Sequence, residues 1–187
     1  MRCPGRCRAV CRAQRLLPSG PRAQAAVNEP GVRQVNATEP SRRAGAADVA
    51  AVNALQHAAY ARNRTILGLE PLPLTVDYAT IVADYDVWLL EQGDALEGVL
   101  ILETRADDLL IWSVAVAPEA QGRGIGNRLL AIAEARAREL GRGKVRLYTG
   151  EKLTGNIAWY ERHGFAVERI EDLGDRRLVH MMKRLGD

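Results

Sequence analysis

Long apolar runs and interior cysteines are both missing from this sequence of 187 residues. No run of about 18 uncharged apolar residues occurs, which excludes a membrane-spanning helix. No internal repeat or heptad period is present, which excludes repeat and coiled-coil architectures. The three cysteines are Cys3, Cys7 and Cys11, and their spacing differs from the C-x2-C pairs of zinc sites. The remaining residues therefore have no disulfide framework and no thiol nucleophile, and we expect no metal.

Positive charge is concentrated in the first 38 residues. This segment holds seven arginines and one acidic residue, Glu29, so residues 39–187 carry a net charge of −3. The basic balance that would suggest a nucleic acid partner thus belongs to the segment alone. Since the segment is too poor in apolar residues to form a core, we expect residues 1–38 to be a disordered leader and residues 39–187 to form one domain. Its prolines and glycines disfavour the alternative of a transit peptide.

The apolar pattern of residues 39–187 predicts strands mixed with helices. Residues 109–116 are almost wholly apolar, as expected of a central strand buried on both faces. We predict strands over residues 39–44, 87–91, 95–103, 109–116, 145–149, 166–170 and 178–183, and helices over residues 46–60, 78–83, 122–140 and 156–163. Residues 62–77, with one glycine and two prolines, are predicted to be a loop. The order indicates an α/β (α+β) fold: a mixed, mostly antiparallel sheet of about seven strands, flanked by about four helices.

A glycine-rich turn joins the apolar strand 109–116 to the long helix. Gly122, Gly124 and Gly126 lack Cβ atoms, so backbone N–H groups can converge on an anion at the helix N-terminus. The guanidinium groups of Arg123 and Arg128 can reach the same anion. A diphosphate fits such a turn, although a glycine-rich helix start that binds nothing is the alternative. The spacing matches neither the dinucleotide motif G-x-G-x-x-G nor the P-loop.

Two motifs resemble those of the GCN5-related N-acetyltransferases (GNAT). The first is Gln121-x-x-Gly124-x-Gly126, which is similar to the acetyl-CoA signature of that family. The second is the run from Asn156 to Phe165, about 35 residues further on and after an intervening strand. The resemblance covers residues 39–187 and implies the acyl-CoA N-acyltransferase fold, in which the sheet is splayed at the cofactor site.

The resemblance also implies a role for particular residues. The backbone of Val114, Ala115 and Val116 would bind the pantetheine arm, and Tyr160 would protonate the departing CoA thiolate. Gln121 would open a turn whose amides bind the pyrophosphate, contributed by Gly122, Arg123, Gly124, Ile125, Gly126 and Asn127. In many relatives an Asn lies seven residues before the Tyr, where this chain has Leu153. Asn156 lies four before, so it either contacts the cofactor or caps the helix.

The residues that would accept the proton of the amine and bind the acceptor are less defined. Neither of the strands 109–116 and 145–149 contains a carboxylate, and Tyr148 stands where some relatives have a Glu. Glu103, Glu151 and a water molecule relayed through Ser113 are the remaining candidates for the base. Candidate residues for the acceptor wall are Tyr60, Arg62, Arg64, Tyr78 and Trp112. Arg62 and Arg64 would either bind an acidic group of the acceptor or lie in a solvated loop. His180 is in the last strand, and the sequence does not fix on which face of that strand its side chain lies.

The predicted function is acetyl-CoA-dependent transfer of an acetyl group to a primary amine of a small molecule or peptide. Transfer would be direct, with no covalent enzyme intermediate. The alternative is a non-catalytic acyl-CoA-binding or sensor domain of the same fold. We expect no nucleic acid or membrane partner, a possible homodimer and a cytoplasmic location.

Overall fold

The computed structural model describes residues 41–186, so the leader predicted for residues 1–38 lies outside the described residues. These residues form a seven-stranded sheet in the order β1-β2-β3-β4-β5-β7-β6. Neighbouring strands are antiparallel except for the parallel pair β4–β5. The strands are β1 (Ser41–Arg43), β2 (Asp86–Gln92), β3 (Ala95–Thr104), β4 (Leu109–Val116), β5 (Lys144–Gly150), β6 (Ala166–Asp172) and β7 (Arg177–Arg184). The predicted fold class, a mixed and mostly antiparallel sheet, is confirmed.

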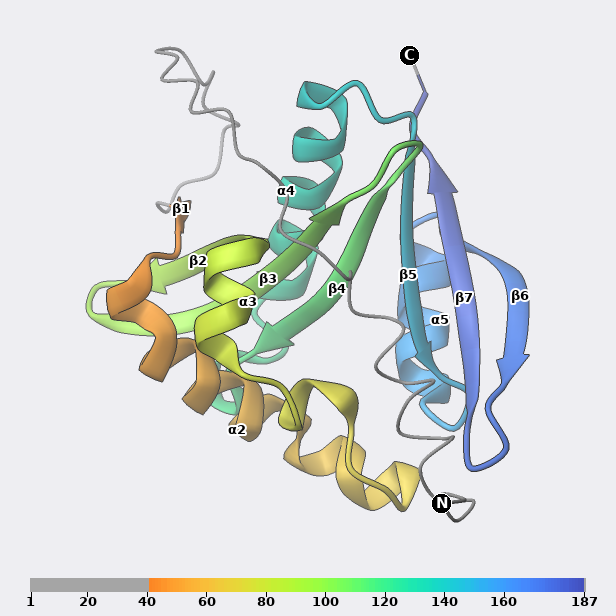
Figure 1. Ribbon diagram of the computed structural model, residues 1–187, viewed down its shortest axis with the longest axis horizontal. Helices are drawn as coiled ribbons and strands as arrows, with labels where there is room; N and C mark the ends of the chain where they lie inside the picture. Colours follow the sequence, from red (N-terminus) through yellow and green to blue (C-terminus); the bar gives the residue numbers. More distant parts are fainter. Residues whose placement is uncertain (1–40, 187) are drawn as a thin grey trace, which may run out of the picture.

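Helices cover both faces of this sheet (Figure 1). The helices α2 (Val49–Leu67) and α3 (Tyr78–Asp84) lie on one face, and α4 (Ile125–Glu139) and α5 (Thr154–Arg162) lie on the other. Short 3₁₀ turns are η2 (Ala46–Asp48), η3 (Leu72–Leu74) and η4 (Pro118–Ala120). The central strands β3 and β4 form the core because both of their faces are covered: residues 99–102 and 109–111 are at most 3% exposed.

The bounds of α2 and α4 differ most from the prediction. Helix α2 does not end near residue 60 but continues to Leu67, where Gly68 terminates it with a φ of 71°. The predicted loop over residues 62–77 was therefore wrong in its first part, since no residue that favours helix termination precedes Gly68. Helix α4 begins at Ile125 rather than at residue 122, because Gly122 and Gly124 have positive φ angles of 78° and 82°.

The parallel pair β4–β5 is very short, and this opens the sheet. Its register contains only Leu109 with Val145, Leu110 with Arg146 and Ile111 with Leu147. On the other side of β4, the ladder with β3 shifts register at this point: Leu102 pairs with Ile111 and Ile101 with Ser113, so Trp112 is an extra residue. Such a bulge bends a strand and increases its twist. Beyond Ile111, the strand β4 therefore diverges from β5 and leaves one of its edges unpaired.

Gly98 on β3 allows the first turn of α4 to lie close to the sheet. A Cβ atom at this position would come within 2.9 Å of Ile125 Cγ2 and 3.2 Å of Leu129 Cδ1. We expect Gly98→Val to lower the free energy of unfolding by about 1–3 kcal/mol, the usual cost of overpacking a core. Urea denaturation followed by circular dichroism measures this loss. Because Ile125→Ala removes the clashing atoms, the double variant should lose less free energy of unfolding than the sum of the two single variants. A loss equal to that sum would contradict a local clash.

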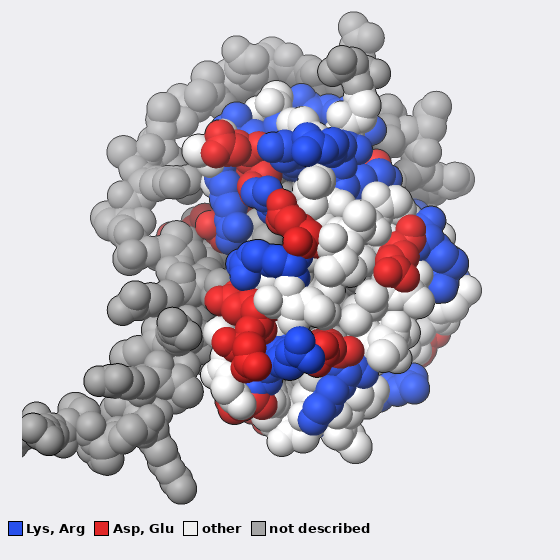
Figure 2. Space-filling model, turned by 90° about the vertical axis from the view of Figure 1, so that its right-hand side faces the viewer, with Lys and Arg blue, Asp and Glu red and all other residues white. Residues whose placement is uncertain are grey.

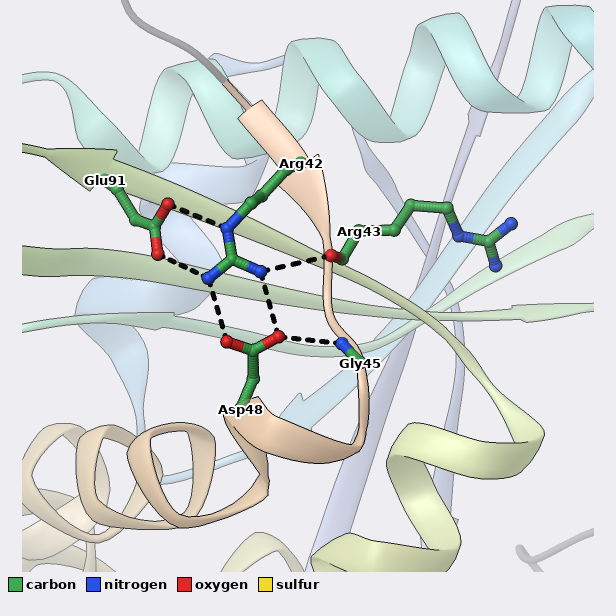
Figure 3. A network of polar contacts seen from close by, with 5 residues as sticks. All are labelled: Arg42, Arg43, Gly45, Asp48 and Glu91. Carbon is green, nitrogen blue, oxygen red and sulfur yellow. Dashed lines mark hydrogen bonds and ion pairs between the residues drawn. The ribbon is translucent and has the colours of Figure 1, made fainter.

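Arg42 connects strand β1 to the start of α2 (Figure 3). Its guanidinium donates to both carboxylate oxygens of Asp48, at 2.8 and 2.9 Å, and to Glu91 on the neighbouring strand. Asp48 also accepts a hydrogen bond from the Gly45 backbone N–H at 2.7 Å. The hydrogen bonds from Arg42, and then that from Gly45, lower the pKa of Asp48 from 3.8 to about 2.

This lowered pKa predicts a pH-dependent contribution to stability. Because the pKa in the folded state lies below that of the unfolded chain, the contribution is complete above about pH 4 and is lost as the pH falls toward 2. We expect Asp48→Asn to lower the free energy of unfolding by at most about 1 kcal/mol at pH 6. The difference from the wild type should shrink near pH 2, as measured by urea denaturation at both pH values. A difference that does not change with pH would contradict the ion pair.

Candidate functional site

A cleft of about 1440 Å³ lies where β4 and β5 diverge. One wall is the end of β4 together with the glycine-rich turn, and the opposite wall is the end of β5 with the first turns of α5. The C-terminal half of α2 and the loop between β6 and β7 line the remainder. The cofactor-site and catalytic residues predicted from the sequence line this cleft, except for the two arginines predicted to reach the anion, Arg123 and Arg128. The short β4–β5 ladder thus brings together two motifs that are 35 residues apart.

The backbone amides of the glycine-rich turn lack backbone acceptors in the described part of the chain, which is what an anion site needs. Within residues 41–186, no backbone carbonyl accepts a hydrogen bond from the N–H groups of residues 122–127. The left-handed conformations of Gly122 and Gly124 direct the chain into the N-terminus of α4, which adds a partial positive charge. The Gln121 side chain donates to the carbonyl of Val116 at 3.3 Å and so connects the turn to the end of β4.

Gly126 has a different function from the two glycines before it. Its φ is not positive, but a Cβ atom there would come within 3.0 Å of Cζ2 of Trp159 on α5. The prediction that the missing Cβ atom of Gly126 also lets amides converge on an anion stays a prediction. Gly126 is small so that α4 and α5 can lie against each other, which sets the distance between the two motifs.

The side chain of Arg123 does not point to the turn. Its guanidinium donates to Glu97, at 2.8 Å, and to Gln92, and both partners lie outside the cleft. The carboxylate of Glu97 is buried, 6% exposed, and the ion pair with Arg123 compensates its charge. The prediction that this guanidinium reaches the anion was wrong, and only the backbone amide of Arg123 remains available. Arg128 is half-buried in the first turn of α4.

Helix α5 places Tyr160 and Asn156 in the cleft. The Tyr160 ring packs edge-on against Phe165, with centroids 5.7 Å apart, and contacts Trp159 at 4.8 Å. Burial, and to a smaller extent the neighbouring Tyr60, raises the pKa of the Tyr160 phenol, so this group keeps its proton at neutral pH. Asn156 is not the helix cap, because α5 begins at Thr154 and Leu153 occupies the cap position. Its contact with a cofactor stays a prediction.

Comparison with known proteins agrees with this geometry. Residues 83–167 match the family model of the acetyltransferase (GNAT) domain. This chain contains a GNAT domain. The match extends from the end of α3 through the glycine-rich turn to the start of β6, so it includes β4 and β5, the two strands between which the cleft opens.

Individual relatives support the GNAT assignment and its fold. The chain is 31% identical over 88 residues to the uncharacterised N-acetyltransferase YvbK of Bacillus subtilis, a match that covers 46% of this chain and 55% of that protein. The chain thus spans about half the length of this curated relative. The structure of PaiA N-acetyltransferase from Thermoplasma acidophilum, in complex with coenzyme A, is similar with a TM-score of 0.67 at 18% identity, over 79% of this chain and 99% of that one. YncA from Salmonella typhimurium, a putative acetyltransferase with acetyl-CoA, gives 0.61 at 22% identity, over 81% and 96%.

A buried polar chain leads from the GNAT cleft into the core. Tyr60 Oη and Ser113 Oγ lie 3.1 Å apart, and Ser113 Oγ donates to Gln56 Oε1 at 3.0 Å. Gln56 is fully buried, and burial raises the pKa of Tyr60. The sequence analysis did not predict a role for Gln56. A Gln on the apolar face of the helix, which includes Val52, Ala59 and Tyr60, could have indicated a buried hydrogen bond. This series of hydrogen bonds ends at the neutral amide of Gln56, so Ser113 is not connected through it to a carboxylate.

The other two candidate bases are both engaged in ion pairs. Glu103 does not line the GNAT cleft and pairs with Arg105 at 3.2 Å. Glu151 does line it, at the tip of β5, and pairs with Arg177 at 2.7 Å. Tyr148 also lines the cleft, but burial raises the pKa of its phenol and disfavours a role as base. The geometry therefore selects no base.

The acceptor wall of the GNAT cleft contains only some of the predicted side chains. Tyr60, Arg62 and Trp112 line it, and Arg62 lies on a helix rather than in the predicted loop. Arg64 pairs with Glu70 instead, and the buried Tyr78 donates to the carbonyl of Pro73 at 2.6 Å. His180 lies outside the cleft. Its Nε2 lies 2.8 Å from a carboxylate oxygen of Glu171, and its ring is tilted against that of Tyr148, with centroids 5.9 Å apart.

Charges on the face that carries the β6 edge are mixed. Figure 2 shows Lys and Arg side chains interspersed with Asp and Glu, with an uncharged area between them and no extended region of one sign. In the described part of the chain, no cluster of three or more His, Cys, Asp or Glu side chains is arranged to hold a metal ion. None of the helices described is long and apolar enough to cross a bilayer.

Proposed function

We propose that this chain is an acetyl-CoA-dependent N-acetyltransferase that acetylates a primary amine of a small molecule or peptide. The observation that carries the proposal is the unpaired edge of β4, which leads directly into a turn with open amides at the start of α4. Residues 114–116 offer backbone groups to an extended pantetheine chain, as a neighbouring strand would. Residues 122–127 lie beyond them, where the two phosphates of coenzyme A would bind.

The chemistry supplied by acetyl-CoA is an activated acyl group on a good leaving group, a thiolate. The unprotonated amine attacks the thioester carbonyl, the C–N bond forms, the C–S bond breaks, and the nitrogen loses one proton to solvent. Tyr160 lines the cleft with its phenol protonated, so it is suited to donate to the departing sulfur. Burial raises the pKa of this phenol, so it is protonated when the reaction begins, and the same desolvation makes an unprotonated thiolate in the cleft unfavourable. The phenol then recovers its proton from solvent.

An assay of thiol release tests this proposal. The full chain is incubated with acetyl-CoA and each member of an amine library, and free CoA is measured with a thiol reagent. We expect release above the hydrolysis rate with at least one amine, and calorimetry should show binding of CoA. Binding of CoA without release for any amine would favour the sensor alternative, and an absence of binding would refute both. A cytoplasmic location and a homodimer stay predictions.

A further inference from the structure

Among the described residues, one cation that lines the acceptor half of the cleft has no hydrogen-bond or ion-pair partner. Four basic side chains line this half: Arg62, Lys152, Arg176 and Arg177. Arg177 pairs with Glu151 at 2.7 Å and Arg176 with Asp175 at 2.8 Å, while Lys152 Nζ donates to the carbonyl of Leu67 at 3.4 Å. Arg62 makes no hydrogen bond or ion pair with any residue in the range 41–186.

The acidic side chains of the same wall are largely engaged. Glu151 and Asp175 belong to the two ion pairs, and Asp172 Oδ1 accepts the backbone N–H of Gly174 at 2.8 Å. Two of the three carboxylates on this wall are therefore already paired with an arginine, and the wall carries four basic side chains against three acidic ones. The wall favours an acceptor that brings a negative charge of its own.

Apolar surface surrounds Arg62. On helix α2, Ala58, Arg62 and Ile66 are spaced four residues apart and so share one face. All three line the cleft, and Ile66 is an exposed large apolar residue at 40%. Leu69 and Pro71 continue this surface after the helix ends. The region that offers the guanidinium can thus also bury an apolar group of the acceptor.

We propose that the acceptor is an amine that carries a carboxylate and an apolar group, such as an apolar α-amino acid, and that Arg62 binds its carboxylate. This inference rests on the proposed function and specifies its substrate class. A planar guanidinium binds a carboxylate through two parallel hydrogen bonds, which gives both affinity and orientation. The apolar group lies against Ile66 and Leu69, and the amine points toward Tyr60 and the end of β4.

The test compares matched amines that differ only in the acidic group. Leucine and leucinamide are assayed by thiol release with acetyl-CoA, and kcat/KM is expressed per unprotonated amine because the two amines differ in pKa. Phenylalanine with its amide, and the phosphonate analogue of leucine, extend the set. We expect the wild type to prefer each carboxylate to its amide by about tenfold or more.

Variants then assign this preference to Arg62. Arg62→Gln should raise KM for the carboxylates until the preference over the amides disappears, with kcat and the Kd for CoA unchanged. Arg64→Gln is the matched control, since this arginine lies on the same helix, pairs with Glu70 and does not line the cleft; it should keep the preference. Three results would overturn this inference but leave the proposed function standing. The wild type could use carboxylate and amide equally, or transfer only to amines without an acidic group. Alternatively, Arg62→Gln could lose the same activity toward both substrates. An absence of thiol release with all amines would overturn the proposed function as well.

Discussion

Replacing Tyr160 by Phe is expected to lower kcat for acetyl transfer by about 100-fold or more, the usual contribution of a positioned general acid. The substitution removes only the phenolic oxygen, so the packing of the ring against Phe165 and Trp159 is kept. Without this donor, the thiolate would leave the buried site unprotonated, which is unfavourable in a medium of low polarity. Steady-state thiol release with an accepted amine measures the change.

Two controls separate the role of the phenol from a general disturbance of the cleft. The Kd for CoA, measured by calorimetry, should stay within about twofold of the wild type, and Tyr148→Phe, a second phenol of the same cleft, should lose much less activity. Burial raises the pKa of Tyr160, so the wild-type rate should rise with pH as the acceptor loses its proton and show no fall due to this residue below about pH 10. An equal loss in both Tyr variants would remove Tyr160 from the proposed chemistry.

Gly124→Val is expected to weaken the binding of CoA by about 10- to 100-fold. The backbone at this position has a φ of 82°, where a β-branched residue costs on the order of 1–3 kcal/mol. A Cβ atom there meets no atom within 4 Å, so the effect is conformational and not steric. Valine would move the chain toward negative φ and turn the neighbouring amides away from their common centre. Calorimetry with CoA measures the loss.

Gly141→Val provides a matched control for this experiment. Gly141 follows the end of α4, has a φ of 65° and has open space around its Cα, but it lies outside the cleft. This variant should lose a similar amount of stability in urea denaturation and keep the affinity for CoA. If instead Gly124→Val binds CoA as tightly as the wild type, then the turn is not the phosphate site.

Local patterns predicted most of the fold. The apolar residues 109–116 and the glycine-rich segment at residues 122–126 each specify a conformation through their own composition, and both appear where they were predicted. The extent of α2 was missed because residues 62–67 are mostly polar and give no strong helical pattern. The bulge at Trp112 could not be predicted, since a change of register depends on the partner strand and leaves no mark in a single sequence.

The candidate site was predicted where backbone geometry decides it and missed where distant side chains decide it. Glycine at positions 122 and 124 permits the positive φ angles that the structure has there. Arg123 turns away because of Glu97, which lies 26 residues earlier and becomes its neighbour only in the folded sheet. The partnership of Gln56 with Ser113 joins residues 57 positions apart and is equally invisible in the sequence.

The three residue pairs between β4 and β5 also have a mechanical consequence. Apart from helix packing and the α2 contacts, they are what joins a four-stranded half-sheet, β1 to β4, to a three-stranded one, β5 to β7. The β4–β5 ladder can open locally before either half unfolds. Its backbone amides should therefore exchange hydrogen with solvent faster than those inside each half. A ligand bound between β4 and β5 would supply contacts to both strands where they do not pair with each other. Binding would therefore reduce local opening and slow the exchange of these amides.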